Sequence, residues 1–172
     1  MTFARACAHF DNDTAAHESR THHEGAARYA FPDRHIEIDN RLSWLLGRLD
    51  RHWGDQAAYV HLTRDPEEVA ESFRKRAGQG IIKAYKDVII ARSTGRAKRV
   101  PVLEFCRDYV DTVTENIATF LADKSHVMHI RLETAQTDFP RFCEWIGATG
   151  DMKAALGEFS VRHNATPNEK DS

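Results

Sequence analysis

The sequence predicts an α/β fold in which a parallel sheet is flanked by helices. Short apolar runs alternate with longer amphipathic segments along its 172 residues, a pattern typical of a layered α/β domain and not of a helical bundle. The length suits one domain. We place that domain at residues 1–163, and we expect the polar residues 164–172 to form a flexible tail.

The first strand and helix are predicted from residues 35–53. The run 35–38 (His-Ile-Glu-Ile) alternates with a period of two, as in a strand with one buried face. Either Asp39 or Asn40 can cap a following helix, and Gly54 ends it. One apolar stripe at helical spacing lies between these limits: Leu42, Leu45, Leu46, Leu49 and Trp53.

The clearest local signals lie at residues 58–68. The apolar run 58–63 predicts a second strand, and it leads directly into a helix start. Asp65 suits the N-cap position, Pro66 the first helical position, and Glu68 completes a capping box. A helix should therefore begin sharply at the carboxyl end of a strand, where open α/β sheets bind ligands and helix N–H groups attract anions.

The rest of the chain continues the alternation. Residues 81–90 show a mixed pattern, and Pro101 opens a long amphipathic helix. Residues 127–132 predict a third strand. A further helix carries one apolar stripe and is closed by Gly147; the stripe consists of Phe139, Phe142, Cys143 and Ile146.

The bulk composition argues against several partner classes. A net charge of -2 and a sequence pI near 6.5 favour neither nucleic acid nor an anionic membrane as a partner. No run approaches the length of about 18 apolar residues that a spanning helix needs, and a signal-peptide pattern is absent from the N-terminus. The three cysteines, without any CxxC pair, indicate reduced thiols, so a cytoplasmic location is expected.

The segment 59–66 (Tyr-Val-His-Leu-Thr-Arg-Asp-Pro), with Val69 and Ser72 after it, resembles the 3'-phosphate-binding motif of the sulfotransferase family. The resemblance implies a P-loop NTPase-like sulfotransferase fold that binds 3'-phosphoadenosine-5'-phosphosulfate (PAPS), with Arg64 and Ser72 on the 3'-phosphate. A guanidinium forks onto phosphate oxygens, and a hydroxyl adds a further donor. Other segments resemble the family in the same order, namely 37–46, 127–133, 142–147 and 164–166.

The N-terminus departs from the family pattern, in which a central strand, a Ser-Gly-Thr-Thr type loop and a helix hold the 5'-phosphosulfate. Residues 1–6 resemble only the end of that loop and its helix, with Thr2 at the place of the last threonine. The resemblance therefore implies an N-terminally truncated fold. Two functions stay open: sulfuryl transfer to a hydroxyl or amine of a small-molecule or glycan acceptor, or nucleotide binding by a catalytically impaired or non-enzymatic relative that lacks the phosphosulfate loop.

A general base is expected at the end of a short strand near residues 15–18. His17 and Glu18 are the candidates by position, because in the family a histidine or glutamate takes the proton of the acceptor. Glu18 is preferred, since related bacterial sequences have a His-Glu pair there. The alternative is that both residues are ordinary surface groups after a strand.

The sequence argues against two other kinds of site. A metal site could draw on Cys7, His9, His17, His22, His23 and Glu24, but the spacing does not fit HExxH and no metal is expected. A P-loop phosphotransferase would need a Gly-x-x-x-x-Gly-Lys-Ser/Thr loop, which is absent. A basic stretch could line the acceptor mouth or clamp the nucleotide, or be a solvated loop; it contains Arg92, Arg96, Lys98 and Arg99.

Overall fold

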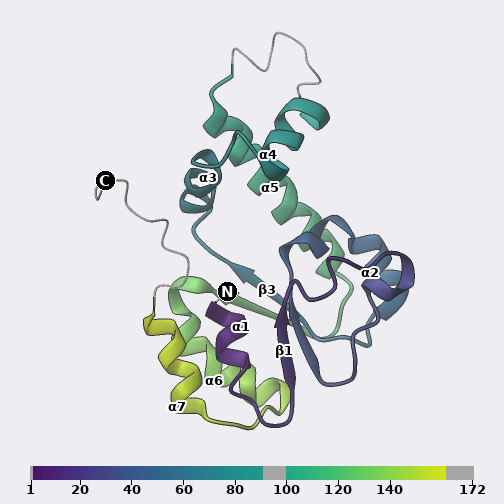
Figure 1. The fold of residues 1–172 in the computed structure, drawn as a ribbon, viewed down its shortest axis with the longest axis vertical. Coiled ribbons are helices and arrows are strands. Elements are labelled where there is room, and N and C mark those ends of the chain that lie inside the picture. Colours follow the sequence, from purple (N-terminus) through teal and green to yellow (C-terminus); the bar gives the residue numbers. More distant parts are fainter. Residues whose placement is uncertain (1, 91–99, 162–172) are drawn as a thin grey trace.

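The computed structural model describes residues 2–90 and 100–161 and confirms the α/β class (Figure 1). The strands are β1 (Thr14–His17), β2 (His35–Ile38), β3 (Tyr59–Thr63) and β4 (Val127–Arg131). They differ from the expected single sheet, because they pair as two separate two-stranded sheets, β1 with β2 and β3 with β4. Both pairs are parallel, so the carboxyl ends of the two strands lie at one edge of each pair.

The helices flank these two pairs. Their bounds are α1 (Thr2–Cys7), α2 (Leu46–Trp53), α3 (Pro66–Arg74), α4 (Gly80–Ala84), α5 (Val102–Leu121), α6 (Ala135–Ile146) and α7 (Met152–Gly157). Short 3-10 helices occupy η1 (Gly25–Arg28), η2 (Asn40–Trp44), η5 (Leu132–Thr134) and η6 (Glu158–Ser160). A π-helix, η3 (Tyr85–Ile90), follows α4, so the segment of mixed pattern is helical.

The helix predicted over residues 42–53 is broken in two. Leu45, with φ -123° and ψ 21°, leaves the helical region and separates η2 from α2. Asp39 is nevertheless a cap, because its side chain accepts a hydrogen bond from the Arg41 N–H at 2.8 Å. The predicted cap is therefore correct in place, but it begins the 3-10 turn and not the α-helix.

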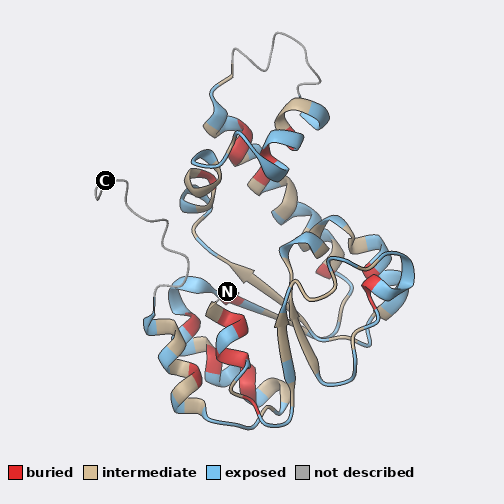
Figure 2. Cartoon of the chain, in the orientation of Figure 1, coloured by how far each residue is buried: buried red, intermediate tan, exposed pale blue. Residues whose placement is uncertain are grey.

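The main core lies between the two strand pairs and the helices α1, α6 and α7. Phe139 is completely buried and its ring contacts those of Phe3, Phe10, Phe142 and Phe159. Figure 2 shows this concentration of buried residues in α1 and α6. Both strand pairs contribute to the same core through side chains that alternate along the strands, namely Ala15, Ile36, Ile38, Val60, Leu62, Met128 and Ile130.

A second, smaller core holds the helical arm formed by α3, α4, η3 and α5, which projects from the sheets (Figure 1). It contains the buried Ala70, Ile82, Tyr85, Cys106 and Tyr109. The Tyr85 hydroxyl donates to the Asp108 carboxylate at 2.5 Å, which ties the π-helix to α5. The arm therefore gives α3 a support of its own, independent of the main core.

All three cysteines are free and buried. Burial raises the pKa of the Cys143 thiol to about 11 and also raises that of Cys106. Both thiols are thus protonated and unreactive at neutral pH. None of the helices in 2–90 and 100–161 has the length and apolar character needed to cross a membrane.

A pair of histidines is expected to make the free energy of unfolding depend on pH. His61 and His129 are opposite each other in the β3–β4 register, with ring centroids 5.6 Å apart. Burial, together with the neighbouring His129, lowers the pKa of His61 below its usual 6.5. Since the unfolded chain then binds more protons, the free energy of unfolding should fall as pH drops from about 7 to about 5.

Urea unfolding at several pH values tests this dependence. In the variant His61→Gln, the free energy of unfolding should fall less over the same pH range. The control His126→Gln, at an exposed position, should behave like the wild type. An unchanged slope in His61→Gln would show that other groups cause the pH dependence.

Candidate functional site

The junction between β3 and α3 is built largely as predicted. Asp65 is the N-cap, its carboxylate accepts from the Glu68 N–H at 2.9 Å, and Pro66 occupies the first turn. The other half of the capping box differs from the prediction. The Asp65 N–H donates to Glu133 at 2.7 Å, and the Glu68 carboxylate accepts from Arg64 instead.

Arg64 lies directly after β3, and two nitrogens of its guanidinium bond to Glu68. Its Nε donates to Glu68 Oε2 at 2.9 Å, and its Nη2 contacts the same oxygen. The two side chains are 47% and 57% exposed. An ion pair this exposed contributes at most about 1 kcal/mol, so the guanidinium can exchange Glu68 for another anion at low cost.

Ser72 lies one turn beyond Glu68 on the same face of α3. Its hydroxyl oxygen accepts from Arg76 Nη2 at a long 3.5 Å. The step from Glu68 to Ser72 is about 6 Å along the helix axis, within the reach of an arginine side chain. The structure thus brings the predicted Arg64 and Ser72 to one face of α3, although no hydrogen bond joins them in the described part of the chain.

Glu133 is a further residue of this site, and no motif in the sequence marks it. It lies in η5, directly after β4. Its carboxylate accepts a hydrogen bond from the Asp65 N–H and so links the end of β4 to the turn that carries Arg64. The hydrogen bond from the Asp65 N–H, with a smaller effect from Arg131, lowers the pKa of Glu133. The signal available in the sequence was its place directly after a predicted strand, at the same sheet edge as Arg64.

The two base candidates lie where β1 ends. His17 is the last residue of the strand and is exposed, without a hydrogen bond or ion pair to the described residues. Glu18 follows with φ +53°, a left-handed conformation that residues other than glycine rarely adopt and that is frequent at functional sites. Its carboxylate forms an ion pair with Arg41, and this hydrogen bond raises the pKa of the arginine.

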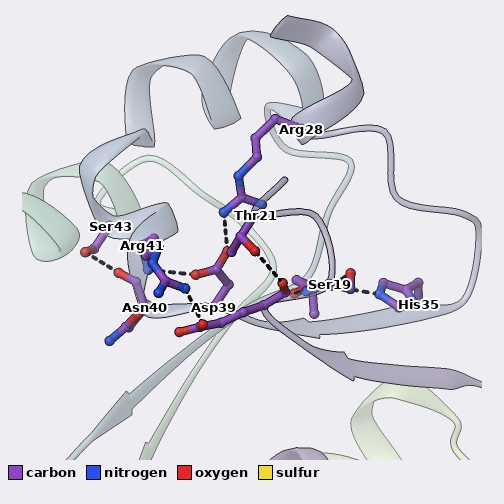
Figure 3. A network of polar contacts seen from close by, with 10 residues as sticks. Ser19, Thr21, Arg28, His35, Asp39, Asn40, Arg41 and Ser43 are labelled. Carbon is purple, nitrogen blue, oxygen red and sulfur yellow. Dashed lines mark hydrogen bonds and ion pairs between the residues drawn. The ribbon is translucent and has the colours of Figure 1, made fainter. Parts of the chain in front are cut away.

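A buried ion pair between Arg28 and Asp39 lies near the end of β1 (Figure 3). The Asp39 side chain is completely buried, and Arg28 contacts it with only 8% of its own side chain exposed. Figure 3 shows that the guanidinium of Arg28 and the backbone N–H of Arg41 both contact the Asp39 carboxylate. Nearby, Glu37 accepts from the Ser19 N–H at 2.8 Å and contacts His35 at 3.1 Å. The hydrogen bond from Ser19 to Glu37 joins the residue after Glu18 to β2.

Thr2 begins α1 and is half-buried. Helix α1 packs against β1 and β2, so Thr2 belongs to the same body as the base candidates. Among residues 2–90 and 100–161, however, no hydrogen bond or ion pair links Thr2, Glu18 and Arg64. The candidate residues therefore form separate groups: Arg64 and Ser72 lie at α3, His17 and Glu18 at the end of β1, and Thr2 at the start of α1.

The candidate metal ligands are dispersed in the structure. Cys7 is buried in the main core, and His9 contacts Glu158 at 3.3 Å. The rings of His22 and His23 lie side by side, with centroids 4.1 Å apart. Over the described ranges, no group of three or more histidine, cysteine or acidic side chains could hold a metal ion.

Some predictions lie outside the described residues. They concern the basic stretch with Arg92, Arg96, Lys98 and Arg99, the segment 164–166 and the tail. In comparisons with known proteins, the chain matches no family model, no curated protein and no solved structure. Function must therefore be inferred from the geometry of the site itself.

Proposed function

We propose that this chain is a sulfotransferase-like protein that transfers a sulfuryl group from PAPS to a hydroxyl or amine of a small-molecule or glycan acceptor. The observation that carries the proposal is that Arg64, directly after the parallel strand β3, donates to Glu68, one helical turn before Ser72 on α3. A guanidinium fork with a hydroxyl one or two helical turns away suits a phosphate monoester, such as the 3'-phosphate of the donor.

The two strand pairs support the P-loop NTPase-like sulfotransferase fold as part of this proposal. A family sheet without its central strand would leave a pair of strands on either side of the gap, which is the pairing of β1 with β2 and β3 with β4. Both pairs pack on one core, as strands of one sheet layer do. Thr2, at the start of α1, would then correspond to the last threonine of the family's phosphosulfate loop.

The other roles follow from position. When bound, the donor would supply an activated sulfuryl group and leave as 3',5'-adenosine bisphosphate. The part of the chain would be to bind the donor and to remove a proton from the acceptor. Glu18 takes this proton, because it is a carboxylate at the carboxyl end of β1 in a constrained backbone conformation. His17 is the alternative base, and its ring is exposed and unpaired among the described residues.

Nucleotide binding without transfer is the second candidate function. The ion pair between Glu18 and Arg41 favours it, since the Glu18 carboxylate is already engaged by a guanidinium and would have to leave it to reach an acceptor. The two functions differ in turnover and not in nucleotide binding. A panel of hydroxyl and amine acceptors, assayed with PAPS and with Glu18→Gln as the comparison, separates them.

Calorimetry with 3',5'-adenosine bisphosphate tests the nucleotide site. Arg64→Ala should weaken binding about 10- to 100-fold, because a charge-assisted hydrogen bond contributes roughly 1.5–3 kcal/mol. Arg74→Ala is the matched control, since Arg74 lies on the same helix and pairs with Glu71. Equal affinities of wild type and Arg64→Ala would overturn the assigned role of Arg64.

A further inference from the structure

Beyond Arg64 and Ser72, the same face of α3 carries a second guanidinium and a carboxylate. Arg76 lies in the turn that follows α3, and its Nε and Nη2 approach the Ser72 carbonyl and hydroxyl oxygens at 3.4 and 3.5 Å. Arg64 reaches the helix at Glu68, one turn before Ser72. We call Arg64, Glu68, Ser72 and Arg76 the α3 stripe.

The guanidinium of Arg76 is supported by an aromatic ring. It lies 5.5 Å from the centroid of Phe73, and Phe73 packs edge-to-face on Tyr109 of the arm core at 5.0 Å. Stacking on a fixed ring orients the planar group while leaving its N–H donors available. The contacts of Arg76 to Ser72 are long, so a stronger acceptor can replace them.

The other carboxylates of α3 are neutralised elsewhere. Glu67 pairs with Arg107 of α5, with Nε to Oε2 at 2.9 Å, and this contact lowers the pKa of Glu67. Glu71 pairs with Arg74. The α3 stripe therefore holds two cations and one carboxylate, so the stripe itself keeps a net positive charge.

From these contacts we propose that the α3 stripe is a two-arginine phosphate site in which Glu68 occupies the anion position until a phosphate displaces it. Arg64 and Arg76 close on the phosphate from the two sides of Ser72, and the Ser72 hydroxyl donates the central hydrogen bond. The displacement of Glu68 is cheap because both partners of its ion pair are exposed. The identity of the ligand, the 3'-phosphate of a nucleotide, rests on the proposed function.

Calorimetry with 3',5'-adenosine bisphosphate, compared with adenosine 5'-monophosphate, tests the stripe. Arg76→Ala should weaken binding of the bisphosphate about tenfold and leave that of the monophosphate unchanged. Glu68→Gln should strengthen binding of the bisphosphate by about threefold, because the competing charge is gone. The matched controls Arg74→Ala and Glu71→Gln, from the neutralised pair on the same helix, should match the wild type.

A second probe separates failure of this inference from failure of the proposed function. Inorganic phosphate is titrated into the protein while the Nε–H signals of Arg64 and Arg76 are followed by NMR; both signals should shift together.

If phosphate moves both signals but the bisphosphate does not bind, the stripe stands and the sulfotransferase proposal fails. If the bisphosphate binds through Arg64, while Arg76→Ala and Glu68→Gln leave its affinity unchanged, the stripe is wrong and the function stands. If neither ligand binds, both are wrong.

Discussion

Replacing Phe139 by alanine is expected to lower the free energy of unfolding by about 3–5 kcal/mol. Its ring is completely buried and lies among four other phenylalanine rings from α1, α6 and η6 and from the loop after α1. The substitution removes apolar surface from the core and leaves a cavity that the fixed rings cannot fill. Because domains of this size are stable by only about 5–15 kcal/mol, much of the total would be lost.

Urea unfolding followed by circular dichroism measures this change, with an unchanged m-value as evidence that the folded and unfolded states are the same. Leu132→Ala is the control, since Leu132 is 41% exposed. It should change stability by no more than about 0.5 kcal/mol. Similar costs for the two variants would contradict the core assignment of Phe139.

The second large effect is expected for Arg28→Ala. This change leaves the completely buried Asp39 carboxylate with the Arg41 N–H as its remaining described hydrogen-bond donor. Breaking a buried ion pair from one side costs about 3–5 kcal/mol, because an uncompensated charge stays in the interior. The same unfolding measurement at neutral pH tests it, and Arg74→Ala, half exposed on α3, should cost at most about 1 kcal/mol.

The double variant Arg28→Met with Asp39→Leu sharpens this test. Removing both charges abolishes the desolvation penalty, so the double variant should recover most of the stability that Arg28→Ala loses. If Arg28→Ala lowered the free energy of unfolding no more than Arg74→Ala does, the Arg28–Asp39 pair would not be buried in solution. If the double variant were no better than the single one, packing and not charge would explain the loss.

Features encoded by neighbouring residues could be predicted from the sequence. The start of α3 at Asp65 and Pro66 depends on one side-chain cap and one fixed backbone angle, both within four residues. The period-two run at 35–38 is a strand with those same bounds. The long helix after Pro101 and the end of α6 at Gly147, which has φ +67°, follow the same local rules.

Features set by distant contacts could not be predicted. The capping box fails because Glu133, far along the chain, takes the Asp65 N–H and frees Glu68 for Arg64. The division into two strand pairs depends on which strand edges meet, which the periodicity of a single strand does not encode. The pairing of Glu18 with Arg41 and the burial of Arg28 with Asp39 also arise only when the loops after β1 and β2 meet.

The two parallel ladders close loops of very different length. Thr14 and His35 of the β1–β2 pair are 21 residues apart, whereas the Asp65–Glu133 bond beside the β3–β4 pair joins residues 68 apart. Loop-closure entropy grows with the logarithm of loop length, so the second ladder costs about 1 kcal/mol more to close. Packing of α3 on α5 shortens the effective distance, and we expect the helical arm to assemble before β3 finds β4 during folding.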